Sequence, residues 1–241
     1  MAKFLDKQRA TIYNSIIPKI MRRKTQMTLS QPFYIEKRDG KSHLNLDGKW
    51  DFACLDAFAK DVAKINFEHT ATLPSSAYMN MYEAGLLPHP YEADNSKLYK
   101  DLDEKVWYYR RTFTLDVLPD AQKQNAYLCF DGISYYSKVW LNGELLGEHD
   151  GMFAGPVVDV ADKLKQGENE LIVEAVAFNY YRDADKKAYG KGYWGYDSTE
   201  IIPWNISKDR DTSNGHFTVI GIWRSVRMEI VPKTHISRPY L

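Results

Sequence analysis

Residues 131–175, DGISYYSKVWLNGELLGEHDGMFAGPVVDVADKLKQGENELIVEA, decide the fold predicted for this chain. The first strand-like run alternates between two faces, with Tyr135, Val139 and Leu141 on one and Ser134, Lys138 and Asn142 on the other. A period of two is typical of a strand with one buried face. Asn142–Gly143 then predicts a tight hairpin, because both central residues of a type I′ turn need positive φ. Residues 144–149 are predicted to form the return strand, and the apolar run 171–176 predicts a buried strand.

Strand-like patterns continue on both sides of this stretch. They occupy residues 43–46, 49–52, 106–115, 127–130 and 218–231. Arg111 interrupts the apolar face of residues 106–115. An inward-leaning arginine is more often a structural group than a ligand contact, and both interpretations stay open. Many short strands separated by turn residues predict an all-β, antiparallel sandwich.

Length and charge bound the class of protein. A chain of 241 residues can bury a large core, and its 32 basic and 32 acidic residues give a formal net charge of zero. This balance favours neither nucleic acid nor a membrane surface, and no run approaches the roughly 20 apolar residues of a membrane span. Aromatic residues make up 14% of the chain. They indicate either a surface that binds carbohydrate or protein, or simply a large β core.

No motif indicates a metal or a cofactor. Cys54 and Cys129 lie in apolar runs and are predicted to be buried thiols rather than a disulfide. The six histidines are scattered, without the spacing of a zinc site. We therefore expect neither a cofactor nor a bound metal.

The strand pattern is interrupted by long segments. Residues 1–28 are predicted to form an N-terminal arm, helical or disordered, and residues 29–241 a sandwich domain. Within that domain, residues 75–105 and 179–216 read as two long irregular insertions. The second insertion carries seven aromatic residues and six carboxylates, more than a plain connection needs. Loops of this length inside a compact domain are often functional.

Six short motifs occur in one order along the chain. They are WYYRRTF at 107–113, DG at 131–132, VWLNG at 139–143, GEHDGMF at 147–153, GENEL at 167–171 and GIWRSV at 221–226. Through them, residues 43–231 resemble the N-terminal sugar-binding domain of family two glycoside hydrolases, the β-galactosidase, β-glucuronidase and β-mannosidase group. The resemblance implies a jelly-roll, galactose-binding-domain-like β-sandwich.

The two insertions bear on the branch of the family. LPHPY at 87–91 followed by Asp94–Asn95, and PWN at 203–205 followed by DRD at 209–211, are similar to the β-mannosidase and exo-glucosaminidase side. The chain departs from the Gly-Trp-Asp-Trp feature of β-mannosidases, since residues 194–197 read Trp-Gly-Tyr-Asp. Where β-galactosidases place a carboxylate, counting back from Gly221 gives Gly215. Asp209 or Asp211 takes that place only if the loop is longer here.

The resemblance implies a function for a longer protein. In the family an immunoglobulin-like domain and a TIM barrel follow this domain, and the barrel holds two catalytic glutamates of a retaining mechanism. No residue here matches the motifs around those glutamates, so no catalytic residue is assigned. The implied role is a non-catalytic domain of a β-glycosidase for terminal β-linked hexosides. The substrate-binding residues expected from the two loops are Asn95, Trp194, Asp197, Trp204, Asn205, Asp209 and Asp211.

Two other functions stay open, namely a stand-alone carbohydrate-binding module and a purely structural or oligomerisation domain. For any one loop aromatic, packing against the sandwich is the simpler explanation. The expected partners are a β-linked hexoside and the immunoglobulin-like and TIM-barrel domains, with neither nucleic acid nor membrane; homo-oligomer formation stays open. The sequence as given predicts a cytoplasmic protein, or a periplasmic or secreted one if an export signal was removed.

Overall fold

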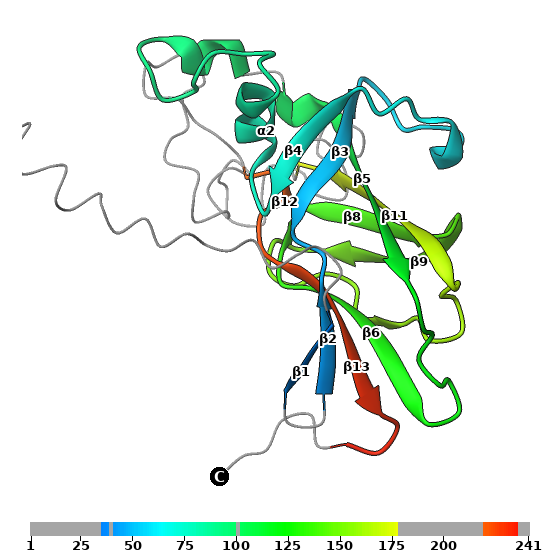
Figure 1. Cartoon of the computed structure of the whole chain (residues 1–241). Helices are drawn as coiled ribbons and strands as arrows, with labels where there is room; N and C mark the ends of the chain where they lie inside the picture. Colours follow the sequence, from blue (N-terminus) through cyan, green and yellow to red (C-terminus); the bar gives the residue numbers. More distant parts are fainter. Residues whose placement is uncertain (1–34, 39–40, 100–101, 178–218, 236–241) are drawn as a thin grey trace, which may run out of the picture. The chain divides into compact units, whose positions relative to one another are not determined.

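Two antiparallel sheets enclose one main hydrophobic core (Figure 1). A computed structural model describes residues 35–38, 41–99, 102–177 and 219–235. Backbone proximity groups residues 32–241 into one unit, to which all described residues belong. The predicted N-terminal arm and the second insertion, 179–216, fall outside the described residues. The predicted all-β antiparallel sandwich is confirmed.

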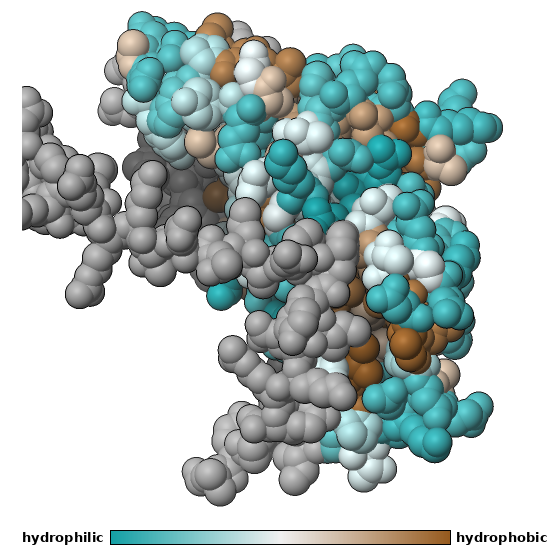
Figure 2. Space-filling view, in the orientation of Figure 1, coloured by the Kyte–Doolittle hydropathy of each residue, from teal (hydrophilic) through white to brown (hydrophobic). Residues whose placement is uncertain are grey.

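The two sheets differ in size. The five-stranded sheet has the order β1 (Ile35–Arg38), β2 (Lys41–Asn45), β13 (Val226–Pro232), β6 (Gln124–Phe130) and β10 (Val158–Asp159). The six-stranded sheet has the order β4 (His69–Leu73), β3 (Gly48–Leu55), β5 (Val106–Leu115), β11 (Gly167–Val176), β8 (Tyr136–Leu141) and β9 (Glu144–Asp150). A separate pair joins β7 (Ile133–Ser134) to β12 (Gly221–Ile222). The described surface in Figure 2 is mainly hydrophilic.

Strand β11 lies inside the six-stranded sheet and is buried on both faces. It pairs with β5 along its whole length and with β8 over residues 171–176. Leu171, Val173 and Ala175 face the main core between the sheets. Ile172 and Val176 face a second, smaller cluster on the outer side. The need to fill both faces explains why this segment is the most apolar strand in the sequence.

The predicted hairpin is confirmed. Strands β8 and β9 pair in antiparallel fashion, and Asn142 and Gly143 have φ values of 53° and 85°. The Asn142 amide donates from Nδ2 to the carbonyl of Lys163 at 3.0 Å and accepts from the Glu170 backbone N–H at 3.1 Å. The turn residue therefore also fastens the hairpin to β11 and the segment before it.

The predicted faces before the hairpin were wrong at Ser134. Ser134 is fully buried in β7, and Tyr135 lies between β7 and β8. The alternation does not run through this point, because β7 pairs with β12 and not with the six-stranded sheet. The Ser134 hydroxyl donates to the Val219 carbonyl at 2.5 Å.

The predicted closing strand, 218–231, is two strands rather than one. Residues 221–222 pair with β7, whereas residues 226–232 pair with β6 and β2. Between them the Trp223 side chain donates from Nε1 to the Met152 carbonyl at 2.7 Å. Three residues, 223–225, separate the two strands, so Ile222 and Val226 keep the same place in the alternation. Both are buried, and the sequence pattern therefore does not reveal the break.

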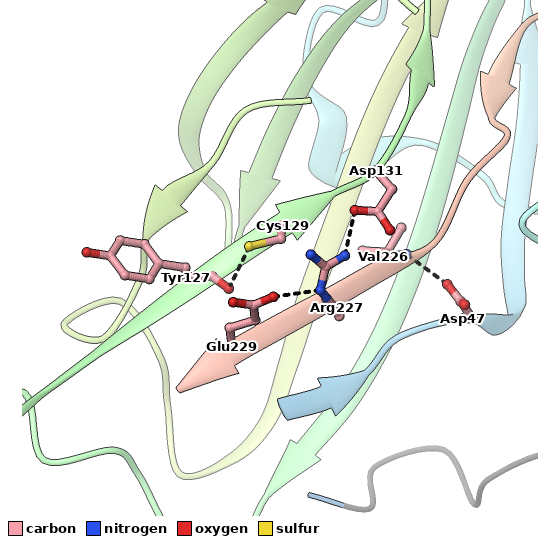
Figure 3. A network of polar contacts seen from close by, with 7 residues as sticks. All are labelled: Asp47, Tyr127, Cys129, Asp131, Val226, Arg227 and Glu229. Atoms are coloured by element: carbon pink, nitrogen blue, oxygen red, sulfur yellow. Dashed lines mark hydrogen bonds and ion pairs between the residues drawn. The ribbon is translucent and has the colours of Figure 1, made fainter. Parts of the chain in front are cut away.

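Polar contacts fasten β13 to its neighbours (Figure 3). Arg227 donates to Asp131 at 2.6 Å and to Glu229 at 2.8 Å. Burial works to lower the pKa of Arg227, but these two carboxylates outweigh it and the pKa is raised. The Val226 backbone N–H donates to the Asp47 carboxylate at 2.8 Å. The start of β13 is thereby joined to the β2–β3 turn and the end of β6.

Arg111 is a structural group, as the sequence favoured. It is 7% exposed, and its guanidinium donates to the backbone carbonyls of Lys49 and Asp47. Cys54 and Cys129 are free thiols, each only half-buried. Burial raises their pKa values to about 12 and about 11.

Glu174 is the one acidic side chain buried within β11 and predicts a pH dependence of stability. It is 5% exposed and accepts a 2.5 Å hydrogen bond from the Tyr108 hydroxyl. Burial raises the pKa of Glu174 above its ordinary value of 4.5; Tyr108 and Lys138 oppose this shift and Glu148 adds to it. The folded state thus binds this proton more tightly than the unfolded state. The contribution of Glu174 to the free energy of unfolding therefore falls as the pH rises above 4.5.

The Glu174→Gln variant keeps an acceptor for Tyr108 but carries no charge. Its free energy of unfolding relative to the parent should therefore increase from about pH 4 to about pH 7, by about 1.4 kcal/mol for each unit by which the pKa is raised. Urea unfolding at several pH values measures this difference. A difference that is flat, or that declines with pH, contradicts the assignment.

Candidate functional site

The insertion 75–105 contains three short helical segments, whereas the sequence predicted an irregular loop. It contains α2 (Ala77–Glu83) and the 3₁₀ helices η2 (Asn95–Tyr99) and η3 (Leu102–Glu104). Ser76 caps α2 by accepting the Met79 backbone N–H, and Gly85 ends it with φ +71°. Ser76 and Gly85 are the local signals from which this helix could have been predicted. We call residues 75–99 the ledge.

The ledge is fastened to the sandwich through β12 and the residue before it. Backbone N–H groups of Ser75 and Ala77 donate to the carbonyls of Ile222 and Ile220 at 3.0 and 2.9 Å. At the other end of α2, the Glu83 carboxylate accepts the backbone N–H of Thr72 on β4 at 3.1 Å. These bonds fix the helix on two sides.

A buried tyrosine supports the ledge from within. Tyr99 is 1% exposed, and its hydroxyl donates to the Pro88 carbonyl at 2.6 Å. Its ring meets that of Tyr78 edge to face, with 5.8 Å between centroids. The inner side of the ledge is therefore a packed extension of the main core.

Asn95 is the one predicted substrate-binding residue that the structure describes. Its Nδ2 donates to the His89 carbonyl at 3.0 Å, and its backbone N–H donates to the Glu92 carbonyl at 3.1 Å. These contacts hold the segment that carries His89. Asn95 thus acts as a support in this structure.

The outer side of the ledge carries three rings that sequence reasoning did not assign to a site. Tyr82 and Tyr91 are 41% and 72% exposed. The half-buried His89 ring lies between them in contact, with its centroid 4.9 Å from that of Tyr82 and 5.8 Å from that of Tyr91. Exposed Leu86 and Leu98 lie in the same segment, and Figure 2 shows hydrophobic residues among hydrophilic ones at the ledge. No sequence pattern separated these tyrosines from buried Tyr78 and Tyr99.

A fully buried polar contact lies beneath α2. The Tyr109 hydroxyl donates to Oδ1 of Asn80 at 3.1 Å, and Asn80 has no exposed surface. Burial raises the pKa of Tyr109, so its hydroxyl remains a donor. This bond joins β5 to the ledge.

Aromatic faces with polar tips suit binding of a flat, hydroxyl-bearing ligand rather than bond cleavage. Among residues 35–38, 41–99, 102–177 and 219–235, no group of three or more His, Cys, Asp or Glu could hold a metal ion. In the same ranges no helix is long and apolar enough to cross a membrane. The remaining predicted site residues lie outside the described residues: Trp194, Asp197, Trp204, Asn205, Asp209 and Asp211.

Comparison with known proteins gives a consistent assignment. The family model described as glycosyl hydrolase 2 galactose-binding domain-like matches residues 50–223. A β-mannosidase B from Thermothelomyces thermophilus is 31% identical over 128 residues, 53% of this chain and 14% of that protein. A β-galactosidase from Clostridium acetobutylicum is 22% identical over 210 residues, 80% of this chain and 20% of that protein.

The solved structure of a β-D-mannosidase from Dictyoglomus thermophilum is similar with a TM-score of 0.59 and 26% identity. That match covers 77% of this chain and 22% of the mannosidase. The chain thus spans between 14% and 22% of the length of these three proteins.

The attachment of the ledge can be tested at Gly221 in β12. Gly221 has φ +95°, and a Cβ there would lie 2.4 Å from the Tyr109 hydroxyl. Gly143 has φ +85° with no atom within 4 Å of such a Cβ, so it is a matched control. We expect Gly221→Ala to lower the free energy of unfolding by about 1–3 kcal/mol more than Gly143→Ala, because only the first overlaps another side chain. Equal losses in urea unfolding contradict this packing.

Proposed function

Because the chain belongs to the family of glycosyl hydrolase 2 galactose-binding-like domains, we propose that it serves as the non-catalytic N-terminal domain of a retaining β-glycosidase. The observation that carries the proposal is the family match over residues 50–223 together with relatives several times longer than this chain. In this proposal an immunoglobulin-like domain and a catalytic TIM barrel belong to the same longer protein. The domain shapes the entrance through which a terminal β-linked hexoside reaches the barrel.

The ledge is the part of the described chain that would meet the sugar. Tyr82 and Tyr91 offer exposed ring faces on a segment held from within by Tyr99 and Asn95. A rigid support reduces the entropy lost when a ligand stacks on these rings. We assign Tyr82, His89 and Tyr91 to sugar contact and Asn95 to their support.

The second insertion would complete the entrance. Trp194 and Trp204 supply further stacking faces in this proposal, and Asp197, Asn205, Asp209 and Asp211 accept hydrogen bonds from sugar hydroxyls. A β-mannoside is the preferred substrate. It is supported by the β-mannosidase among the curated relatives and by the solved β-D-mannosidase structure at 26% identity.

The exposed rings of the ledge also support a second function, a stand-alone carbohydrate-binding module. Calorimetric titration of the 241-residue chain with mannosides, galactosides and chito-oligosaccharides separates the two. Heat of binding that Tyr91→Ala abolishes favours the module, because the sugar then binds at the ledge. The absence of such heat leaves the accessory role. If the domain is purely structural, replacing Trp204, Asn205 and Asp211 by alanine in a longer enzyme should leave kcat/KM unchanged.

The accessory role can be tested in a fusion protein. The chain replaces the matching segment of the Dictyoglomus thermophilum β-D-mannosidase, and hydrolysis of an aryl β-D-mannoside is measured. The chain alone should release no aglycone. In the fusion, Tyr82→Ala and Tyr91→Ala should each lower kcat/KM about fivefold, the equivalent of roughly 1 kcal/mol for one stacking contact.

Val117→Ala is the matched control for the fusion. Val117 is 77% exposed and follows β5 at the end opposite the ledge. It should leave kcat/KM unchanged. Turnover by the isolated chain contradicts the non-catalytic role, and equal kcat/KM for the Tyr91 and Val117 variants contradicts the assignment of the ledge.

A further inference from the structure

Residues 56–68, which we call the strap, leave the six-stranded sheet between β3 and β4. Three contacts fasten the strap to β5 and the residue before it. Lys105 pairs with Asp56, the Tyr108 hydroxyl accepts the Ala59 backbone N–H at 3.0 Å, and the Arg110 guanidinium lies 4.5 Å from the centroid of the Phe67 ring. Val62 and Ile65 pack on the outer cluster formed by Val106, Tyr108, Ile172 and Val176. The strap is thus held at its start, its middle and its end.

A cavity of about 610 Å³ lies between the strap and the end of β3. It exists because β4 pairs with β3 only from Gly48↔Leu73 to Phe52↔His69, so residues 53–55 extend beyond their neighbour. The strap does not fill this space, because its contacts hold it against β5. A volume of this size falls within the range of about 300–1,000 Å³ of small-molecule sites.

The lining combines an apolar floor with a mixed polar rim. Ala53, Leu55, Ala59 and Ile65 contribute aliphatic surface. Asp61 and Lys64 form a 3.2 Å ion pair on the rim, and the Asn66 amide donates to Glu68 at 2.6 Å. Lys60 lines the cavity as well and makes no ion pair with any described residue. The rim carries two ammonium and two carboxylate groups, so its formal charge sums to zero.

This chemistry selects a class of ligand. A rim of zero net charge offers no advantage to an anion or a cation. Carboxylates accept and ammonium and amide groups donate, which matches hydroxyl groups that do both. A pyranose ring presents such hydroxyls around an apolar face that fits an aliphatic floor.

We propose that the cavity under the strap is a second binding site, separate from the ledge, for a neutral saccharide. One ring packs on Ala53, Leu55 and Ile65, and its hydroxyls bond to Asn66, Glu68 and Lys60. The site depends on the strap and the end of β3 alone. It therefore stands whether or not the ledge contacts sugar.

The two cysteines provide an internal test. Cys54 lines the cavity, whereas Cys129 lies on β6 in the other sheet. Both thiols are free and half-buried. The 241-residue chain is treated with methyl methanethiosulfonate, and the modification rate of each cysteine is followed by mass spectrometry. Methyl β-D-mannoside is the probe, and glycerol at equal concentration is the control for a general polyol effect.

The proposal predicts that methyl β-D-mannoside slows modification of Cys54 severalfold and leaves Cys129 unchanged. The exposed pair Asn66→Ala and Glu68→Ala should abolish this protection, whereas Tyr91→Ala on the ledge should preserve it. An unchanged Cys54 rate overturns the proposal. Equal slowing of both cysteines, equal slowing by glycerol, or loss of protection in Tyr91→Ala also overturns it, because the effect then arises outside the cavity.

Discussion

The antiparallel pairing of β11 with β5 and β8 is the constraint on which the rest of the structure depends. Ten residues of β11 pair with β5, and both faces of β11 are covered. One face closes the main core against the five-stranded sheet, and the other requires a second cover on the outside. The strap supplies that cover, and the cavity is a consequence of how it does so. Glu174 is tolerated in this setting because Tyr108 donates to its carboxylate.

Strand β5 carries both appended segments on opposite faces. On its inner face, Tyr109 reaches Asn80 beneath the ledge; on its outer face, Tyr108 and Arg110 hold the strap. The sheet therefore has two roles: it forms the core, and it positions the two appended segments. Apolar burial specifies the frame, and a few hydrogen bonds and ring contacts place the segments that face a ligand. The ledge and the strap can thus carry different chemistry without altering the core.

The sequence predicted the frame well, because strand alternation and the Asn142–Gly143 turn are local signals. It did not predict the break at Trp223–Ser225, since Ile222 and Val226 keep the same parity across it. Helix α2 was missed because its seven residues give too short a pattern, and its stability comes from bonds to β12. The expected substrate contact of Asn95 stays a prediction; the structure adds that its side chain donates to the His89 carbonyl. Tyr82 and Tyr91 were not assigned to a binding site, because their spacing in the sequence does not show which tyrosines of the ledge are exposed.

Native-state amide hydrogen exchange tests the central position of β11 most directly. Amides of residues 171–176 should exchange only through global unfolding, with the largest free energies of opening in the chain. Amides of edge strand β9, and the Ala59 and Ala77 amides that fasten the strap and the ledge, should open locally at lower free energy. Exchange from β11 that is as fast as exchange from β9 would contradict the account.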